Sequence, residues 1–209
     1  MSKQKWLITG GAGYIGTHIA DLFIEAGKDV VLLDSLYQGL KPRVDYLSKK
    51  HGQEIPLHIV DIRDYTAVEN ILKENNFAGI VHTAALKAVG ESVEKPDLYH
   101  QVNVDGSRKL LDEMHKSGVT KLVFSSSAAT YGEPEQVPIL ETAPTKPTNP
   151  YGATKLEIDQ MITAEAASRG IAAASLRYFN VAGALKSKRG WLAERHNPET
   201  HLIPNVLRS

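Results

Sequence analysis

Near its N-terminus the chain reads Lys5-Trp6-Leu7-Ile8-Thr9-Gly10-Gly11-Ala12-Gly13-Tyr14-Ile15-Gly16. The apolar start of this stretch is typical of a buried strand, and glycines then recur at Gly10, Gly13 and Gly16. Glycine lets the backbone turn sharply and lets a pyrophosphate approach bare amides, and the N-terminus of a following helix adds N–H groups and a favourable dipole. Placed between a strand and a helix, the stretch predicts a dinucleotide-binding turn.

Short apolar runs and longer helical patterns alternate along the rest of the chain. We expect strands at Lys5–Thr9, Asp29–Asp34, Ile55–Val60, Ile80–Ala84, Lys121–Ser125 and Ala172–Arg177, each of them buried. We expect helices at Tyr14–Ala26, Thr66–Asn75, Pro96–Ser117 and Pro150–Arg169. Most of the strands are continuous apolar runs, as in a parallel sheet that is covered on both faces. The pattern therefore predicts an α/β fold with a doubly wound parallel sheet of the Rossmann type.

Three stretches do not fit this alternation. Glu133–Asn149 contains four prolines and is expected to be a loop. Gly183–Thr200 is polar and irregular, and His201–Ser209 has the pattern of an opening apolar helix. We therefore expect a dinucleotide-binding domain at 1–182, which also carries the catalytic residues. Residues 183–209 are expected to begin a truncated substrate-binding region, with the substrate domain largely missing.

Acidic residues at two strand ends extend the predicted cofactor site. Asp34 ends the second predicted strand, where a carboxylate accepts both ribose hydroxyls of an adenosine and repels a 2′-phosphate, which favours NAD over NADP. The alternative is that Asp34 only caps a loop. Asp61 and Ile62 follow the third predicted strand, where an adenine edge could be met, although a simple turn explains them as well.

A phenol and an ammonium stand near the start of the last predicted helix. Tyr151 and Lys155 are spaced i, i+4, which puts both on one helix face. A positive charge about 5 Å away contributes on the order of 3 kcal/mol at an effective dielectric of about 20. That is about two pKa units, so we expect Lys155 to lower the pKa of the Tyr151 phenol toward a working range. The run Ser125-Ser126-Ser127 stands at the end of a strand on the carboxyl edge of the sheet, where a serine hydroxyl, expected to be that of Ser127, could hold a reacting alcohol beside Tyr151.

Composition excludes several classes of function. The 209 residues include 24 Lys plus Arg and 24 Asp plus Glu, so no overall charge favours nucleic acid or an anionic membrane. There is no cysteine for a disulfide or a thiol nucleophile, and the eight histidines lack metal-ligand spacing. Without a signal peptide or an apolar stretch of membrane-spanning length, we expect a cytoplasmic enzyme.

Together these motifs resemble those of the extended short-chain dehydrogenase/reductase superfamily and, within it, of the UDP-glucose 4-epimerase family. The resemblance covers essentially the whole chain and rests on Thr9–Gly16, Leu86–Ser92, Ser125–Gly132, Tyr151–Lys155 and Arg177–Asn180. It implies an isomerase of galactose metabolism that interconverts UDP-glucose and UDP-galactose through a 4-keto intermediate, with tightly bound NAD. It also implies a homodimer that pairs through the outer face of the helix Pro96–Ser117.

The same resemblance implies roles for individual residues. Tyr151 takes the proton of the sugar 4-hydroxyl, Lys155 holds the cofactor ribose, and Ser127 hydrogen-bonds the hydroxyl. The expected cofactor-binding residues are Gly10, Gly13, Tyr14, Ile15, Gly16, Asp34, Asp61, Ile62, Thr83, Ala84, Ala85, Lys87, Asn103, Ser125, Tyr151, Lys155 and Phe179. The expected substrate-binding residues are Lys87, Ser127, Tyr151, Asn180, Leu202 and Ile203.

Two other interpretations of the sequence stay open. One is another NAD-dependent enzyme that modifies nucleoside-diphosphate sugars, such as a 4-reductase or a decarboxylase. The other, for a truncated chain, is an NAD-binding module without activity. Dehydration is not expected, because sugar-nucleotide 4,6-dehydratases carry an acidic pair where this chain has Ala128 and Ala129.

Overall fold

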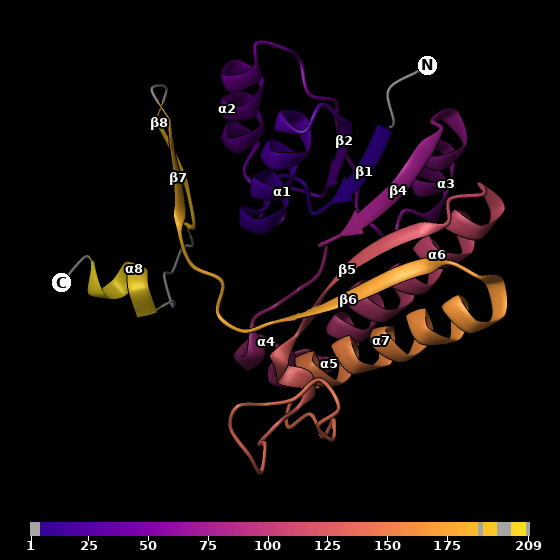
Figure 1. Ribbon diagram of the computed structural model, residues 1–209, viewed down its shortest axis with the longest axis vertical. Coiled ribbons are helices and arrows are strands. Elements are labelled where there is room, and N and C mark those ends of the chain that lie inside the picture. The colour runs from indigo at the N-terminus through magenta and orange to yellow at the C-terminus, as the bar shows by residue number, and fades with distance from the viewer. Residues whose placement is uncertain (1–4, 188–189, 196–201, 208–209) are drawn as a thin grey trace.

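Six parallel strands form the central sheet of the computed structural model, which describes residues 5–187, 190–195 and 202–207 (Figure 1). The strands are β1 (Lys5–Thr9), β2 (Asp29–Asp34), β3 (Leu57–Ile59), β4 (Phe77–His82), β5 (Lys121–Ser127) and β6 (Ala172–Tyr178). Their order in the sheet is β3-β2-β1-β4-β5-β6, and every neighbouring pair is parallel. This confirms the predicted doubly wound Rossmann-type sheet, whose order reverses between β1 and β4.

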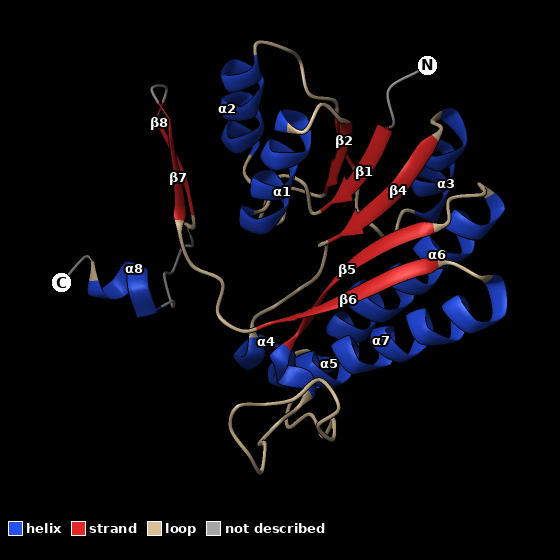
Figure 2. Ribbon diagram, viewed as in Figure 1, coloured by secondary structure: helices blue, strands red, loops and turns tan. Residues whose placement is uncertain are grey.

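Helices cover both faces of the sheet (Figure 2). The helices are α1 (Tyr14–Glu25), α2 (Lys41–His51), α3 (Tyr65–Glu74), α4 (Val89–Glu94), α5 (Pro96–Tyr99), α6 (Gly106–Lys116), α7 (Pro150–Arg169) and α8 (Leu202–Val206). Helices α1 and α2 lie on one face, and α3, α6 and α7 lie on the other. None of the helices in the described part of the chain has the length and apolarity needed to cross a membrane.

Two apolar clusters hold these layers together. Because successive strand residues point to opposite faces, Leu7 and Ile8 of β1 enter different clusters. Leu7 belongs to the cluster that also contains Met114 and Ile158 from α6 and α7, whereas Ile8 belongs to the cluster with Leu47 from α2. This double burial explains why the strands are continuous apolar runs rather than alternating ones.

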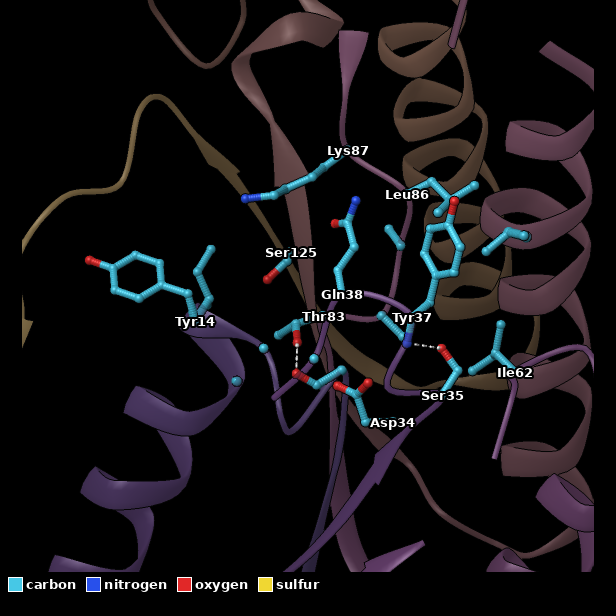
Figure 3. A pocket seen from close by; sticks show the side chains of 18 of the residues that line it. Tyr14, Asp34, Ser35, Tyr37, Gln38, Ile62, Thr83, Leu86, Lys87 and Ser125 are labelled. Atoms are coloured by element: carbon cyan, nitrogen blue, oxygen red, sulfur yellow. Dashed lines mark hydrogen bonds between the residues drawn. The ribbon is translucent and has the colours of Figure 1, made fainter. Parts of the chain in front are cut away.

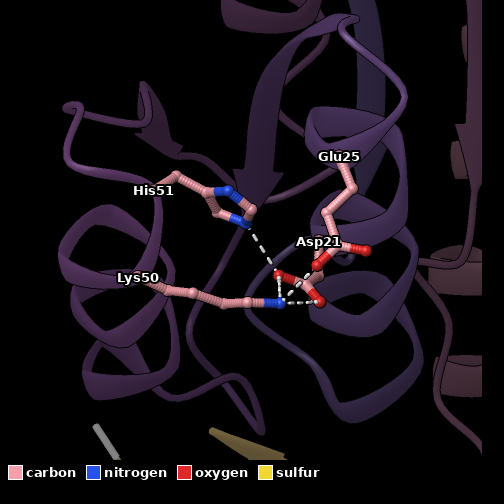
Figure 4. Close-up of polar contacts among 4 residues, drawn as sticks. All are labelled: Asp21, Glu25, Lys50 and His51. Atoms are coloured by element: carbon pink, nitrogen blue, oxygen red, sulfur yellow. Dashed lines mark hydrogen bonds and ion pairs between the residues drawn. The ribbon is translucent and has the colours of Figure 1, made fainter. Parts of the chain in front are cut away.

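A polar cluster fastens α2 onto α1 (Figure 4). The Asp21 side chain on α1 is only 2% exposed, and its carboxylate receives Lys50 Nζ at 2.6 Å and His51 Nε2 at 2.7 Å. Lys50 also reaches Glu25 at 2.8 Å. Lys50 and His51 are the last residues of α2, so these contacts fix the position of this helix. Arg43, near its first residue, lines the cavity described below.

Most predicted elements are present, with shifts at their ends. Strands β1 and β2 and helix α7 have the predicted bounds, while β3 is shorter and β4 begins at Phe77 rather than Ile80. The expected helix Pro96–Ser117 consists of α5, a π-helical turn at His100–Asp105 and α6. The proline-rich stretch Glu133–Asn149 is a loop, as predicted.

Two expectations about the elements were wrong, and two helices were missed. Neither outer strand is buried as expected: Leu57 and His58 of β3 are half-buried and Ile59 is exposed, and Ala172 to Leu176 of β6 are exposed, because these two strands are the edges of the described sheet. The segment Gly183–Thr200 is not irregular throughout, because it contains a hairpin of β7 (Ala184–Ser187) and β8 (Gly190–Ala193). Helices α2 and α4 were not anticipated. Helix α8 agrees with the helix expected at the C-terminal end, where His201, Arg208 and Ser209 lie outside the described residues.

Candidate active site

A cavity of about 800 Å³ lies over the carboxyl ends of the strands, where doubly wound sheets bind their ligands (Figure 3). Almost all predicted site residues line it: Gly10, Gly13, Tyr14, Ile15, Gly16, Asp34, Asp61, Ile62, Thr83, Ala84, Ala85, Lys87, Ser125, Ser127, Tyr151, Lys155, Phe179 and Asn180. The structure thus brings together residues that are up to 170 positions apart in the chain, from Gly10 to Asn180.

The glycine turn connects β1 to α1 at one side of this cavity. Gly13 is extended and caps α1, and the Thr17 N–H donates to the Gly13 carbonyl at 3.1 Å. The turn and the helix pack so closely that a Cβ on Gly16 would lie 2.2 Å from the Gly10 carbonyl oxygen. The first amides of a helix have no carbonyl partner within it, so this cradle offers N–H groups and a positive dipole end to an anion.

Asp34 is a fixed carboxylate at the end of β2. It is 6% exposed and accepts the Ala12 N–H at 3.0 Å and the Leu36 N–H at 2.8 Å. Burial raises its pKa, while the backbone amides of Leu36 and Ala12 and the charge of Arg43 lower it. The result is an acceptor of defined position facing the cavity, which suits ribose hydroxyls and disfavours a phosphate.

Lys155 lies beneath Tyr151 and is 3% exposed. Its Nζ donates to the Ser125 carbonyl at 2.8 Å and lies 4.7 Å from the centroid of the Phe124 ring and 5.9 Å from that of Tyr151. Burial lowers the pKa of Lys155 to about 8, against the opposing effect of the Asp159 carboxylate. At neutral pH the side chain therefore remains mostly an ammonium.

Tyr151 and Ser127 both line the cavity, and the Ser127 side chain is close enough to act on the pKa of the phenol. Burial raises the pKa of the phenol, and the Ser127 side chain lowers it. We expected Lys155 to lower the pKa of Tyr151. Among the groups of the protein itself it does not, and the pKa of Tyr151 is raised. The physical reason is desolvation, which acts on the phenol while the Lys155 ammonium faces the Ser125 carbonyl and the Phe124 ring.

Three predicted site residues do not line the cavity. Asn103 is fully buried behind it, where its Oδ1 accepts the Leu86 N–H at 2.8 Å and its Nδ2 donates to the Leu86 carbonyl at 3.0 Å. Leu202 and Ile203 lie on α8 and are 77% and 52% exposed. Their role in a uridine pocket stays a prediction. Asp61 is at the rim, where Arg63 binds it at 2.7 Å and lowers its pKa.

The charged lining residues that the sequence reasoning missed include Arg43 and Glu194. Arg43 on α2 is 8% exposed, and its guanidinium donates to the Ala193 carbonyl at 3.2 Å. Glu194 follows β8 and pairs with Lys87 at 3.3 Å. Arg43 lies in a polar helix and Glu194 in a stretch without periodicity, so no local sequence pattern marked either residue as part of a site.

The chain is similar to known proteins over nearly its whole length. A family model described as the NAD-dependent epimerase/dehydratase family matches residues 6–209. The chain is 50% identical over 204 residues to a UDP-glucose 4-epimerase of Streptomyces lividans, a match that covers 97% of this chain and 59% of that protein. A UDP-glucose 4-epimerase of Corynebacterium glutamicum is also 50% identical, over 98% of this chain and 58% of its own. The chain therefore spans about three fifths of the length of these curated relatives.

Solved structures give the same relationship. The UDP-glucose 4-epimerase from Stenotrophomonas maltophila with bound NAD and formylated UDP-arabinopyranose matches with a TM-score of 0.92 and 37% identity, over 98% of this chain and 61% of that one. The UDP-glucose 4-epimerase from Brucella ovis in complex with NAD matches with a TM-score of 0.88 and 37% identity, over 98% and 60% of the two chains.

Proposed function

The chain belongs to the NAD-dependent epimerase/dehydratase family, and from this membership we propose that it binds NAD and interconverts UDP-glucose and UDP-galactose by inverting the sugar at C4. The observation that carries the proposal is that Ser127 and Tyr151 line the same cavity as the glycine turn, with the Lys155 Nζ 5.9 Å from the centroid of the Tyr151 ring. The two relatives at 50% identity described above are named UDP-glucose 4-epimerases.

The residues of the cavity fit a dinucleotide. The close contact of Gly16 with Gly10 leaves backbone amides without covering side chains, which suits a pyrophosphate. Asp34 would accept the adenosine ribose hydroxyls, and Lys155 would hold the nicotinamide ribose. Lys87 would add positive charge near the phosphates, and Asn180 would reach the diphosphate of the sugar nucleotide.

Ser127 and Tyr151 would carry out the proton transfer to and from the substrate hydroxyl. A bound nicotinamide supplies a hydride acceptor and donor for C4 of the sugar. Ser127 would orient the 4-hydroxyl, and the Tyr151 oxygen would take its proton and later return it. Because burial raises the pKa of the Tyr151 phenol, positive charge is needed to stabilise the phenolate, and Lys155 is the buried cation on the same helix face.

The groups around this pair favour epimerisation over related reactions. Ala128 and Ala129 present methyl groups to the cavity where removal of water would need an acid and a base. A cofactor-sensing module has no use for a hydroxyl-activating tyrosine, which argues against a role in binding alone. A 4-reductase or a decarboxylase would use the same fold, and its products distinguish it.

Replacing Tyr151 by Phe tests the proposed base. We expect Tyr151→Phe to bind NAD within about twofold of the unsubstituted protein and to lose roughly a hundredfold to ten-thousandfold in turnover of UDP-galactose. The assay measures UDP-glucose formed, net NADH and carbon dioxide. Turnover close to normal in Tyr151→Phe contradicts the role of the phenol, and net NADH or released carbon dioxide contradicts epimerisation itself.

We further propose that the protein acts in the cytoplasm as a homodimer and that residues 183–209 belong to its substrate-binding region. The inner face of α6 is used within the chain, since Leu110 and Met114 are 1% exposed. Its outer face carries Arg108, which pairs with Glu157 of α7 at 3.3 Å and leaves a two-helix surface for a second copy. Light scattering coupled to size-exclusion chromatography measures the mass, and a monomer at all concentrations contradicts the dimer.

A further inference from the structure

Behind the cavity wall, a buried histidine joins the ends of two strands to a helix. His82 is the last residue of β4, is 2% exposed and does not line the cavity. Its Nδ1 lies 2.6 Å from the Thr9 hydroxyl at the end of β1, and its Nε2 lies 2.8 Å from the Ser107 hydroxyl on α6. The His82 ring also stacks on Phe124 of β5 at 5.6 Å between centroids.

The neighbouring hydrogen bonds determine which nitrogen of His82 carries the proton. The Ser107 hydroxyl donates to the Asn103 carbonyl at 2.5 Å, so its oxygen accepts from His82 Nε2–H. With the proton of His82 on Nε2, the Thr9 hydroxyl donates to His82 Nδ1, while its oxygen accepts the Ala84 N–H at 3.3 Å. With the proton on Nδ1 instead, the Thr9 hydroxyl would have no acceptor among the described residues.

Electrostatics favours the same neutral form. Burial lowers the pKa of His82 to about 3, and the positive charge of Lys155 on α7 acts in the same direction. The other groups that contact the ring are uncharged: Thr9 from β1, Ser107 from α6 and Phe124 from β5. A neutral imidazole therefore persists through the whole physiological range of pH.

The Thr9 hydroxyl oxygen that contacts His82 also accepts the Ala84 N–H, and so ties His82 to the loop Thr83–Lys87, which lines the cavity. At the start of the loop, the Thr83 hydroxyl donates to the Thr9 carbonyl at 2.7 Å. Further along, the Asn103 side chain accepts a hydrogen bond from the Leu86 N–H and donates one to the Leu86 carbonyl.

The same network continues to the catalytic helix α7. Asn103 Nδ2 donates to the Thr154 hydroxyl at 3.2 Å, and that hydroxyl donates to the Tyr151 carbonyl at 2.7 Å. His82 is thus linked through Ser107 and Asn103 to the turn of α7 that carries both Tyr151 and Lys155.

We propose that His82 is a positioning residue, which as the neutral Nε2–H tautomer locks the loop Thr83–Lys87 between the glycine turn and α7 and so sets the geometry of the NAD pocket. The inference rests on the proposed NAD binding for its function, whereas the tautomer can be measured in the protein alone.

Nuclear magnetic resonance of the histidine ring nitrogens tests the tautomer directly. The chain has eight histidines, and the His82 signals are those that disappear in the variant His82→Gln. We expect chemical shifts of an Nε2–H tautomer that stay constant between about pH 5 and pH 9. A proton on Nδ1, or a titration centred near the ordinary histidine pKa of about 6.5, overturns the assignment.

Cofactor affinity tests the positioning role. We expect His82→Phe, which retains a ring on Phe124 but neither hydrogen bond, to weaken NAD binding at least tenfold by calorimetry. The variant His82→Gln retains a donor for Ser107 and should recover part of the loss. The control Met114→Ala removes a core side chain that is 1% exposed, so it lowers stability without touching this network, and NAD affinity should stay within about twofold.

The possible outcomes separate the two proposals. If His82→Phe does not fold, Ser107→Ala removes one link of the same chain and should weaken NAD binding severalfold. Equal affinities for the His82, Ser107 and Met114 variants, compared at equal folded fractions, overturn the positioning role. Absence of NAD binding in the unsubstituted protein removes the proposed function, while the tautomer is still decided by the ring-nitrogen signals.

Discussion

Burial of the charged Lys155 side chain lowers the stability of the folded protein, and the proposed function would require that burial. The folded-state pKa of Lys155, about 8, lies below the ordinary value of 10.5, because the ammonium is removed from water. Between these values the unfolded chain holds a proton that the folded chain has released, so stability rises as the pH increases from about 8 to 10.5. Below pH 8 both states are protonated and the folded state bears the whole cost, on the order of 3 kcal/mol.

We therefore expect Lys155→Met to stabilise the protein at pH 7 by about 1–3 kcal/mol, since part of the gain is offset by the lost hydrogen bond to the Ser125 carbonyl. The rise in stability between pH 8 and 10.5 should be smaller in the variant. Urea unfolding at pH 7, 8.5 and 10 measures both effects. The control Lys41→Met, at an exposed pair with Asp45, should change little. A variant less stable than the unsubstituted protein at pH 7 contradicts the account.

The same residue shows what sequence reasoning captures at this scale. The i, i+4 spacing predicted that Lys155 and Tyr151 lie together, and they do, at 5.9 Å from the Lys155 Nζ to the Tyr151 ring centroid. The spacing could not give the sign of the pKa change of Tyr151, because desolvation depends on what packs around the phenol. Phe124 and the β5 carbonyl that surround Lys155 come from a strand about 30 residues earlier.

At the scale of elements, the start of α7 meets the short 3₁₀ turn Ala128–Thr130 that follows Ser127. A Cβ on Gly152 would lie 2.6 Å from the Ala129 carbonyl oxygen and 3.1 Å from Pro147 Cβ. Ser127 caps this turn by accepting the Ala129 N–H at 3.1 Å. Any side chain at Gly152 therefore pushes α7, and Tyr151 with it, away from Ser127.

Gly152→Ala should lower stability by about 1–3 kcal/mol through overpacking and lower turnover by tenfold or more, because Tyr151 and Ser127 no longer meet one hydroxyl. The matched control is Ala153→Gly at the next, exposed position, which costs about 1 kcal/mol of helix propensity but makes no close contact. Thermal unfolding and turnover are measured for both variants. Equal turnover in the two variants would show that the close approach of α7 does not matter.

Elements were predictable where local signals were strong. The bounds of β1, β2 and α7 follow from apolar runs that end at glycine or aspartate and from Pro150 in the first turn of α7. Helix α2 was missed because only Arg43, Val44 and Leu47 of its eleven residues are buried, which gives a weak periodic pattern. The exposure of β6 depends on its place at the edge of the sheet, which no local pattern reports.

For the whole molecule, the hairpin β7–β8 packs against the N-terminal half, where Leu192 joins the apolar cluster that contains Ile8 and Leu47. The hairpin β7–β8 reaches the N-terminal half through Tyr14, whose hydroxyl donates to the Gly183 carbonyl at 2.7 Å, and through Arg43, which binds the Ala193 carbonyl. The parallel sheet made the clustering of the glycine turn, Asp34 and Tyr151 predictable, since strand ends meet at one edge. The hairpin contacts depend on packing across about 150 residues and were not predictable.

A ligand that spans this cavity should stabilise the whole molecule, and the charge at Asp34 should decide which dinucleotide does so. At a hundred times its Kd, NAD adds about 2.7 kcal/mol to the free energy of unfolding. For a chain of this size that corresponds to a rise in Tm of roughly 5–10 °C. NADP should give less than a third of this shift at the same concentration, because its 2′-phosphate would face the Asp34 carboxylate, which two backbone amides hold in place.

Asp34→Asn keeps an acceptor oxygen for a backbone amide but removes the charge. In this variant we expect the NAD-induced shift to fall and the NADP-induced shift to rise, so that the two approach each other. Scanning fluorimetry with each dinucleotide, and calorimetry for stoichiometry, measure the effect. Equal shifts by NAD and NADP in the unsubstituted protein would contradict the role of Asp34. A stoichiometry far from one per chain would mean that the cavity over the strand ends is not the dinucleotide site, since a single cavity holds both the glycine turn and Asp34.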